Sequence, residues 1–273
     1  YLQNFQSVGN CVDYLNLIDH LFRALGSILP GQRILDAGCG NGTGGQYLLH
    51  HLAELSHPGT DMNPVHYVGI DIVPDALVRA KHQLDLSGKD AHEVSDPSRK
   101  DLQLSWARMD LHKRLPFADD SFDRILSNLV LGYVKTPTAA LKDLYRVLAP
   151  GGRMVISNLI PDGDFSGIYQ RLVMHAQNLQ EREQARDLLN NYGKIRQAEK
   201  EGRFCFHSRE QWQKILKNLG QQEAKIYSTF SNQAFLIVIE KPPVMTQSLP
   251  VLDRKSPQVP AHEDFAPLLR CAA

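Results

Sequence analysis

Five glycines stand close together in the segment ILDAGCGNGTGG, at positions 38, 40, 42, 44 and 45. Three of them, Gly40, Gly42 and Gly45, have the G-x-G-x-x-G spacing of loops that bind the phosphates of a dinucleotide. Glycine lets a strand turn sharply into a helix and lets the backbone approach a ligand closely. The loop therefore binds a phosphate, binds another kind of nucleoside, or forms a tight turn without a ligand. The spacing alone does not choose among these.

Acidic residues mark the three strands expected nearest to the loop. Asp36 lies in the first strand, Asp71 ends the second and Asp110 ends the third. Ligands of open α/β sheets bind beyond the carboxyl ends of the strands, so we expect these carboxylates to face one ligand. An aspartate after the second strand can accept hydrogen bonds from both ribose hydroxyls, and one after the third can accept from an adenine amine. Such a rim favours a cationic ligand without phosphates, because like charges repel.

Alternating strands and helices are expected to position these residues. Apolar residues at helical spacing predict a helix within residues 1–29, and the glycine loop is expected to open another at 44–55. Further helices are expected at 74–85 and 138–148, the second ended by the APGGR segment at 149–153. Strands are expected at 33–38, 66–73, 105–110, 122–131 and 154–160. This alternation predicts an α/β fold, with a parallel sheet and helices on both faces.

The alternation stops after the fifth strand. Residues 163–204 read as one or two long helices with no strand, and an apolar stripe runs along them from Phe165 to Leu179. Such a stripe belongs either to a helix packed over the sheet edge or to a helical lid over a largely apolar acceptor. We favour the lid, because the segment directly follows strand five.

The chain is expected to close the sheet after this segment. Ser208 followed by Gln211 forms the pattern of a capping box at the start of a helix. The segments EAKIYSTF and QAFLIVIE, joined by the turn SNQ, predict an antiparallel pair. We therefore assign residues 1–240 to one domain and 241–273, which is rich in proline, to a linker or docking tail.

The composition limits the functional classes. Apolar residues make up 42% of the 273 residues, and 30 Lys and Arg balance 30 Asp and Glu. A net charge of zero argues against a nucleic-acid partner. No apolar run approaches the roughly 18 residues of a membrane-spanning helix. The four cysteines form no CxxC pair, which favours free thiols in a reducing, cytoplasmic compartment.

Four segments in this order resemble the motifs of class I S-adenosylmethionine-dependent methyltransferases. They are ILDAGCGNGTGG, YVGIDIVPDAL, LPFADDSFDRILSNLVLGYV and LYRVLAPGGRMVIS. The resemblance spans roughly residues 10–160, and more loosely the closing hairpin to 240. It implies a Rossmann-like sheet of seven strands with the last one antiparallel, S-adenosylmethionine as cofactor and S-adenosylhomocysteine as product. The implied cofactor-binding residues are Asp36, Gly38, Cys39, Gly40, Gly42, Asp71, Ile72, Asp110, Leu111, Asn128 and Leu129.

The implied reaction is a direct displacement at the methyl carbon of a sulfonium ion. The protein aligns the reacting atoms and excludes water, and it needs a general base only when the acceptor must lose a proton. His175 and His207 are the candidates for that base, although no recognisable motif surrounds either. Tyr14, Tyr133 and Tyr169 are candidates for binding a small, partly apolar acceptor.

Two other functions also fit parts of the sequence. The glycine spacing also fits an NAD-dependent oxidoreductase. The start at Tyr1 and the proline-rich tail also fit a non-catalytic methyltransferase-like module of a larger polypeptide. Seven of the eleven histidines lie between His50 and His112, but their spacings match no zinc pattern, so we expect no metal. The sequence does not predict the oligomeric state.

Overall fold

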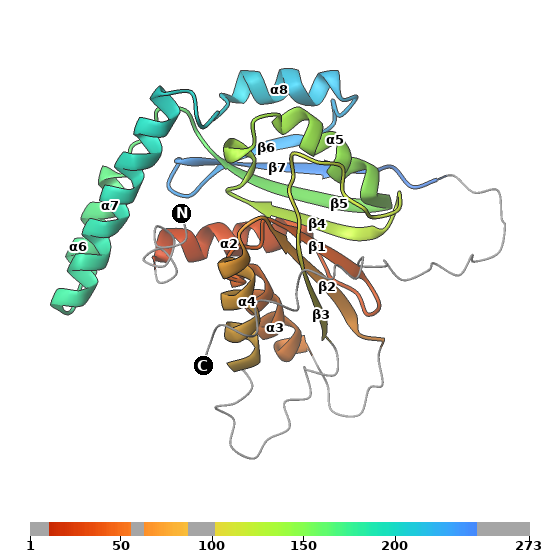
Figure 1. Ribbon diagram of the computed structural model, residues 1–273, viewed down its shortest axis with the longest axis horizontal. Helices are drawn as coiled ribbons and strands as arrows, with labels where there is room; N and C mark the ends of the chain where they lie inside the picture. The colour runs from red at the N-terminus through yellow and green to blue at the C-terminus, as the bar shows by residue number, and fades with distance from the viewer. Residues whose placement is uncertain (1–10, 56–62, 87–101, 245–273) are drawn as a thin grey trace, which may run out of the picture.

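The computed structural model describes residues 11–55, 63–86 and 102–244 (Figure 1). Residues 1–10 of the expected helical segment 1–29, residues 56–62 and 87–101, and nearly all of the proline-rich tail lie outside the described residues.

Seven strands form one sheet in the order β3-β2-β1-β4-β5-β7-β6 (Figure 1). The strands are β1 Arg33–Ala37, β2 Val65–Asp71, β3 Leu102–Arg108, β4 Phe122–Asn128, β5 Leu148–Leu159, β6 Lys225–Thr229 and β7 Ala234–Glu240. β7 pairs antiparallel with both β5 and β6, whereas β1 to β5 pair parallel. The predicted seven-stranded, mostly parallel sheet with an antiparallel final strand is confirmed. Because β1 to β5 are parallel, their carboxyl ends meet at one edge.

Helices cover both faces of the sheet, as expected. They are α2 Val12–Leu25, α3 Thr43–Leu55, α4 Pro74–Leu86, the 3-10 turn η2 Leu131–Tyr133, α5 Pro137–Val147, α6 Ser166–His175, α7 Leu179–Lys200 and α8 Arg209–Asn218. α2, α3 and α4 lie on one face, and α5 and α8 lie on the other (Figure 1). Successive strand residues alternate between the two cores: Ile34 packs under α2 and α3, and Leu35 packs under α5.

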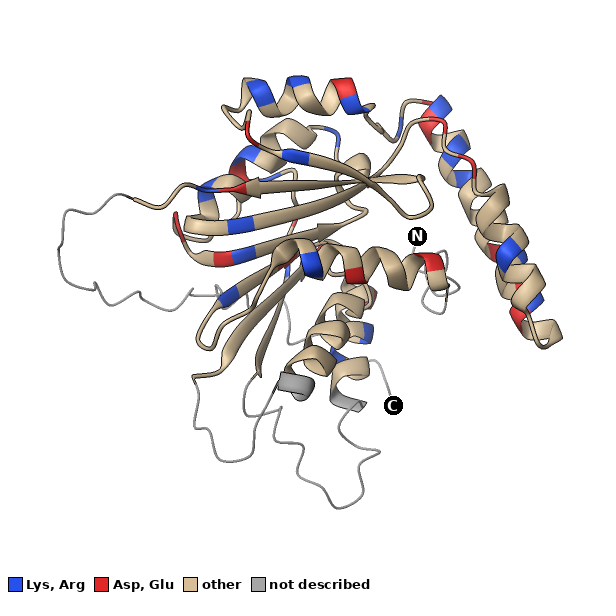
Figure 2. Ribbon diagram, turned by 180° about the vertical axis from the view of Figure 1, so that it is seen from behind, with Lys and Arg blue, Asp and Glu red and all other residues tan. Residues whose placement is uncertain are grey.

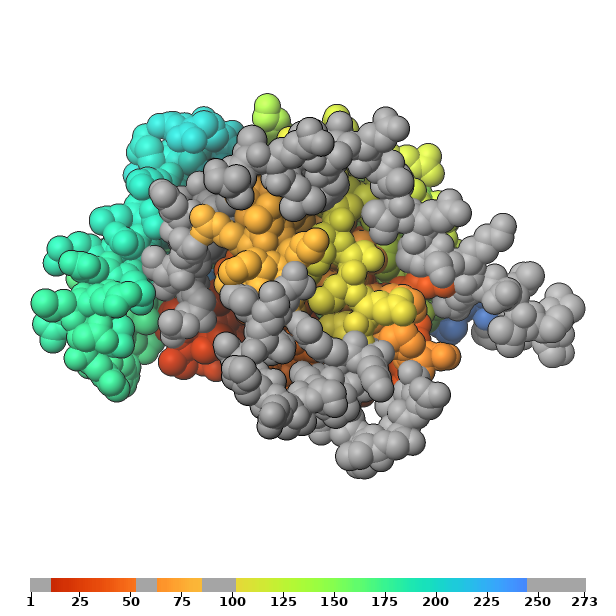
Figure 3. Space-filling view, turned by 60° about the horizontal axis from the view of Figure 1, so that its bottom comes forward, coloured from red at the N-terminus to blue at the C-terminus, as the bar shows by residue number. Residues whose placement is uncertain are grey.

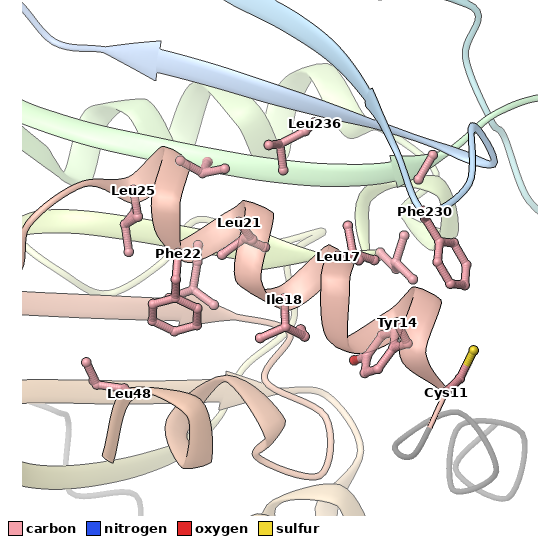
Figure 4. Close-up of a cluster of buried hydrophobic side chains, with 14 of the residues drawn as sticks. Cys11, Tyr14, Leu17, Ile18, Leu21, Phe22, Leu25, Leu48, Phe230 and Leu236 are labelled. Atoms are coloured by element: carbon pink, nitrogen blue, oxygen red, sulfur yellow. The ribbon is translucent and has the colours of Figure 1, made fainter. Parts of the chain in front are cut away.

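Helix α2 packs flat against the sheet through one apolar face (Figure 4). Its buried residues are Tyr14, Leu17, Ile18, Leu21, Phe22 and Leu25, which recur at helical spacing. Full burial of each such side chain contributes about 1.5–3 kcal/mol. Asp13 in the first turn and Arg23 in the last both complement the helix dipole. This face holds α2 over the edge where the carboxyl ends of the strands meet.

Strand β5 begins earlier than the sequence suggests. The APGGR segment, expected to separate a helix from a strand at 154, instead belongs to β5, which starts at Leu148. Leu148 pairs with Phe122 of β4, and the register shifts before Arg124 pairs with Arg153. The N–H of Gly151 donates to the carbonyl of Lys241, so strand pairing continues through the glycines.

The segment after β5 forms a hairpin of two helices, α6 and α7, that projects beyond the sheet (Figures 1 and 2). Basic and acidic residues alternate along α7. Phe165 and Ile168 of the apolar stripe are buried, but Leu179 is 79% exposed. The stripe ends early because Asn178 caps a new helix: its side chain accepts a hydrogen bond from the N–H of Glu181 at 2.9 Å.

Candidate active site

A pocket lies at the carboxyl ends of β1, β2 and β4, beneath helix α2; we call it the strand-end pocket. Chain order reverses around β1, which is where open α/β sheets bind ligands. Its lining residues are Tyr14, Ile18, Leu21, Phe22, Asp36, Gly38, Cys39, Gly40, Asn41, Thr43, Gly44, Asp71, Arg79, Leu126, Asn128, Leu129 and Val130. The lining combines an apolar wall from α2 with two carboxylates and one guanidinium.

Asp36 is a buried carboxyl group in this pocket, with 2% of the residue exposed. The hydroxyl of Tyr67 donates a hydrogen bond to Oδ2. Burial raises the pKa of Asp36 to about 7; the bond from Tyr67 opposes this, and the charge of Asp71 adds to it. A cation beside Asp36 would favour the ionised carboxylate. A Cβ at Gly44 would lie 2.7 Å from Oδ2, so only glycine leaves room for this carboxylate.

Asp71 joins the end of β2 to the glycine loop. Its Oδ2 accepts a hydrogen bond from the N–H of Gly40 at 2.9 Å, and Oδ1 accepts from the N–H of Val73 at 2.9 Å. Burial raises the pKa of Asp71, although these N–H groups oppose the rise. Each carboxylate oxygen has two acceptor positions, so both oxygens can accept a further bond from a ligand hydroxyl.

Gly38 and Gly40 shape the pocket wall in different ways. Gly38 has φ +85°, and a Cβ there would lie 2.4 Å from Cγ2 of Val130. Gly40 has φ +54°, and a Cβ there would meet no heavy atom within 4 Å. The loop therefore packs closely on the residues after β4 at Gly38 and leaves open space at Gly40. Cys39 also lines the pocket, and burial raises the pKa of its thiol, which keeps it neutral.

Tyr14 of α2 and Asn128 at the end of β4 meet across the pocket. Nδ2 of Asn128 donates to the Tyr14 hydroxyl at 3.0 Å. The Ser157 hydroxyl donates to Oδ1 of Asn128 at 2.5 Å, which fixes the orientation of the amide. Burial raises the pKa of Tyr14 to about 12, and the charge of Asp36 adds to the rise. Tyr14 is therefore a neutral phenol that ties α2 to the strand ends.

Some expected cofactor residues lie outside the strand-end pocket. Gly42, Ile72, Asp110 and Leu111 are absent from its lining. Oδ1 of Asp110 accepts from the N–H of His112 at 2.9 Å and contacts His112 Nδ1 at 2.7 Å. The N–H of His112 holds the pKa of Asp110 below its ordinary value. A Cβ at Gly42 would meet Ala80 of α4 at 2.9 Å, so this glycine allows helix packing.

The expected acceptor-side residues are spread over a wider area. Of these, only Tyr14 lines the strand-end pocket. The Tyr133 ring packs against Phe204, with ring centroids 4.6 Å apart. His175 lines a separate groove. His207 is half-buried, and its ring centroid lies 5.2 Å from that of Trp212. Burial lowers the pKa of His207. Tyr169 lies on α6, partly buried and outside this pocket.

Sequence reasoning missed the apolar wall of the pocket and the partner of Asp36. Ile18, Leu21 and Phe22 were readable as one helix face, but not as a cover for a ligand site. Tyr67 reaches Asp36 because β1 and β2 pair in parallel with Asp36 opposite Gly69, a register that neither strand reveals alone.

The described ranges contain neither a metal-binding cluster nor a membrane-spanning helix. Residues 11–55, 63–86 and 102–244 contain no group of three or more His, Cys, Asp or Glu placed to hold a metal ion. Among the helices of that same part of the chain, none has the length and apolar character to cross a bilayer.

The seven-stranded sheet and the position of the strand-end pocket are those of a class I methyltransferase. The family model described as "Methyltransferase domain" matches residues 28–233, so the chain belongs to the S-adenosylmethionine-dependent methyltransferases of class I. The cofactor of this family is S-adenosylmethionine. Two buried carboxylates and an open space beside Gly40 fit a cationic nucleoside.

Known relatives match about half of the chain. The malonyl-[acyl-carrier protein] O-methyltransferase of Erwinia billingiae is 31% identical over 148 residues, which are 54% of this chain and 47% of that protein. The demethylmenaquinone methyltransferase of Renibacterium salmoninarum is 30% identical over 155 residues, 56% of this chain and 52% of that protein. The chain thus spans about half the length of these relatives. A solved S-adenosylmethionine-dependent methyltransferase from Aquifex aeolicus shares the fold, with a TM-score of 0.52 and 14% identity over 88% of this chain and 97% of that one.

Proposed function

We propose that this chain transfers a methyl group from S-adenosylmethionine to a small, partly apolar acceptor by direct displacement. The observation that carries the proposal is the pair of buried carboxylates, Asp36 and Asp71, at the ends of adjacent strands in one pocket. Arg79 adds one cation to the lining. Such a set suits a ligand that carries an ammonium group, a carboxylate and ribose hydroxyls, and it disfavours a diphosphate.

The proposed cofactor contacts follow from the geometry of the strand-end pocket. Asp71 would accept from the ribose hydroxyls, and Asp36 would hold the amino group. Gly38, Cys39, Gly40, Asn128 and Leu129 would line the rest of the cofactor site. Three expected adenine contacts do not belong to the pocket lining: Ile72, Asp110 and Leu111. We therefore place their contacts with the adenine at the outer end of the pocket. Gly42 would act indirectly, through the packing of α4.

The chain's own contribution to the reaction is alignment and exclusion of water. The cofactor supplies a methyl group already activated by a sulfonium centre. Tyr14 and Asn128, held by Ser157, present a fixed pair of polar groups at the end of β4. The apolar wall of α2 keeps water from that end of the pocket. Correct placement of reacting groups is among the largest contributions that a protein makes to such a reaction.

On the acceptor side we place Tyr14 nearest to the reacting atoms, with Tyr133 and Tyr169 further away. His175 and His207 do not line the strand-end pocket, so we propose a transfer in which neither acts as general base. The names of the relatives, one for malonyl-[acyl-carrier protein] and one for demethylmenaquinone, support an acceptor other than nucleic acid.

Isothermal titration with S-adenosylmethionine and with NAD tests this proposal. Saturable binding of S-adenosylmethionine alone supports it, and binding of NAD alone would favour the oxidoreductase. A second assay follows S-adenosylhomocysteine formation over a panel of small alcohols, phenols, amines and carboxylic acids. Cofactor binding without turnover on any member of a broad panel would favour a non-catalytic module.

A further inference from the structure

We propose that the groove between the start of α2 and the α6–α7 hairpin binds an extended hydrocarbon chain, acyl or isoprenoid, carried by the methyl acceptor. We call it the α2–hairpin groove. The proposal rests on the methyl-transfer function above and adds the class of acceptor. Val12 of α2, Leu172 and Ala176 at the end of α6 and its exit, and Ala185 of α7 contribute apolar surface to its walls. Figure 3 shows the hairpin beside the N-terminal helix on the molecular surface.

The charged side chains of the groove are already engaged with the protein. Arg171 donates to Asp13 through Nη2 at 2.8 Å and Nε at 3.2 Å, and it also donates to Ser231 at 2.7 Å. Glu181 accepts from the N–H of Gln177 at 2.7 Å and from Nδ2 of Asn178 at 2.8 Å. An ionic head group would have to compete with these bonds. A hydrocarbon chain would leave them intact.

Each of the three helices that line the groove also exposes large apolar side chains. Val12 is 66% exposed, and Leu15, one turn along α2, is 46% exposed. Met174 of α6 and Leu179 of α7 are 73% and 79% exposed.

Apolar residues connect this groove to the hairpin's inner face. Leu172 is followed along α6, towards its start, by the buried Ile168 and Phe165. Ala185 is followed along α7 by the buried Leu188 and Tyr192. Phe165 and Tyr192 stack with their ring centroids 3.7 Å apart, so both strips end at one aromatic pair.

Phe230 packs between that aromatic pair and Tyr14 of the strand-end pocket. The ring of Phe230 lies 5.3 Å from that of Phe165 and 6.4 Å from that of Tyr14. Tyr14 lines the strand-end pocket, and its neighbours Cys11 and Asp13 line the groove. Figure 4 shows Cys11 and Tyr14 at the start of α2. One turn of α2 therefore separates the two hollows. A chain bound in the groove would therefore end about one helical turn from an acceptor group placed beside Tyr14.

Binding of the neutral apolar dye N-phenyl-1-naphthylamine to the full chain tests the proposal. The dye's fluorescence rises on burial, and octanol, decanol and dodecanol then compete for its site. The expected competition strengthens with chain length, up to about fourfold for each buried methylene. Val12→Glu is expected to weaken dye binding at least tenfold, and Val78→Glu on α4, also an exposed valine at 56%, is expected to leave it unchanged. The Val12 variant retains its fold, because a carboxylate in a first helical turn suits the helix dipole.

Three outcomes would overturn the inference. They are no dye binding, equal effects of the two valine substitutions, and dye binding that appears only after removal of residues 1–10, which would assign the groove to that segment. S-adenosylmethionine binding is measured on the same samples. An unsubstituted chain that does not bind S-adenosylmethionine would contradict the proposed function. Persistence of this binding alongside any of the three outcomes would contradict only the assignment of the groove.

Discussion

Replacement of Asp71 by asparagine is expected to weaken S-adenosylmethionine binding about 10- to 140-fold. Both carboxylate oxygens already accept a backbone N–H at 2.9 Å, and each has room for one more donor. Asparagine keeps the size and one acceptor oxygen but places an NH₂ group where the other oxygen was. Loss of a hydrogen bond to a charged group costs about 1.5–3 kcal/mol, and about 1.4 kcal/mol corresponds to tenfold in affinity.

Isothermal titration of both proteins measures this effect, and thermal unfolding verifies that the variant is folded. Asp75→Asn is the matched control, because Asp75 lies four residues further on, exposed in the first turn of α4. An Asp71→Asn protein that is folded and binds within twofold of the original would refute the assignment of Asp71 to the ribose. A similar loss in the Asp75 variant would show that the effect is not specific to the pocket.

Three further substitutions test other parts of the structure. Burial raises the pKa of Asp36 to about 7, so its contribution to the stability of the ligand-free fold is full below pH 3.8 and is lost as the pH rises through 7. Cofactor affinity is expected to change oppositely, falling about tenfold per pH unit below 7, and titrations across pH should show no such slope in Asp36→Asn. Tyr14→Phe leaves the partly buried Asn128 amide without its acceptor. Denaturant unfolding should therefore show a loss of about 1–3 kcal/mol in the free energy of unfolding, and turnover should fall more than cofactor affinity. Tyr227→Phe, at an exposed tyrosine, serves as its control, and equal losses in both variants would contradict the role of Tyr14. Ser208→Ala removes the capping box of α8 and should lower the free energy of unfolding by about 1 kcal/mol, measured by thermal unfolding. Cofactor affinity should stay constant, because α8 covers the sheet face opposite to α2. A changed affinity would contradict the separation of α8 from the cofactor site.

Local sequence signals predicted the parts of the site that depend on one strand and its following turn. The glycine loop and Asp71 belong to this group, because the strand end and the turn are encoded by adjacent residues. The capping box at Ser208 and the closing hairpin were likewise readable, and the structure confirms both.

Features that join distant segments could not be predicted in this way. Asn128 and Tyr14 are 114 positions apart and meet only because α2 lies over the end of β4. The Tyr67 hydrogen bond to Asp36 depends on the register of β1 and β2. Asp110 accepts from the N–H of His112, two residues later, a bond that the sequence analysis did not anticipate. Asp71 makes the same local turn with the N–H of Val73, so the turn is compatible with a ligand contact.

The helical segment after β5 shows a further limit. Its helices were predictable from composition and spacing. The apolar stripe was expected to reach Leu179, but a new helix begins after Asn178 and leaves the Leu179 side chain exposed. The position of the hairpin beside α2 depends on contacts of Arg171 with Asp13 of α2 and Ser231 of the β6–β7 turn, which join segments far apart in the sequence.

A crystal structure of the chain with S-adenosylhomocysteine tests the central claim most directly. We predict ribose hydroxyl oxygens within about 3.2 Å of the Asp71 carboxylate and the amino group beside Asp36, with α2 over the ligand. A ligand bound outside the strand-end pocket, or one whose ribose does not contact Asp71, would contradict it.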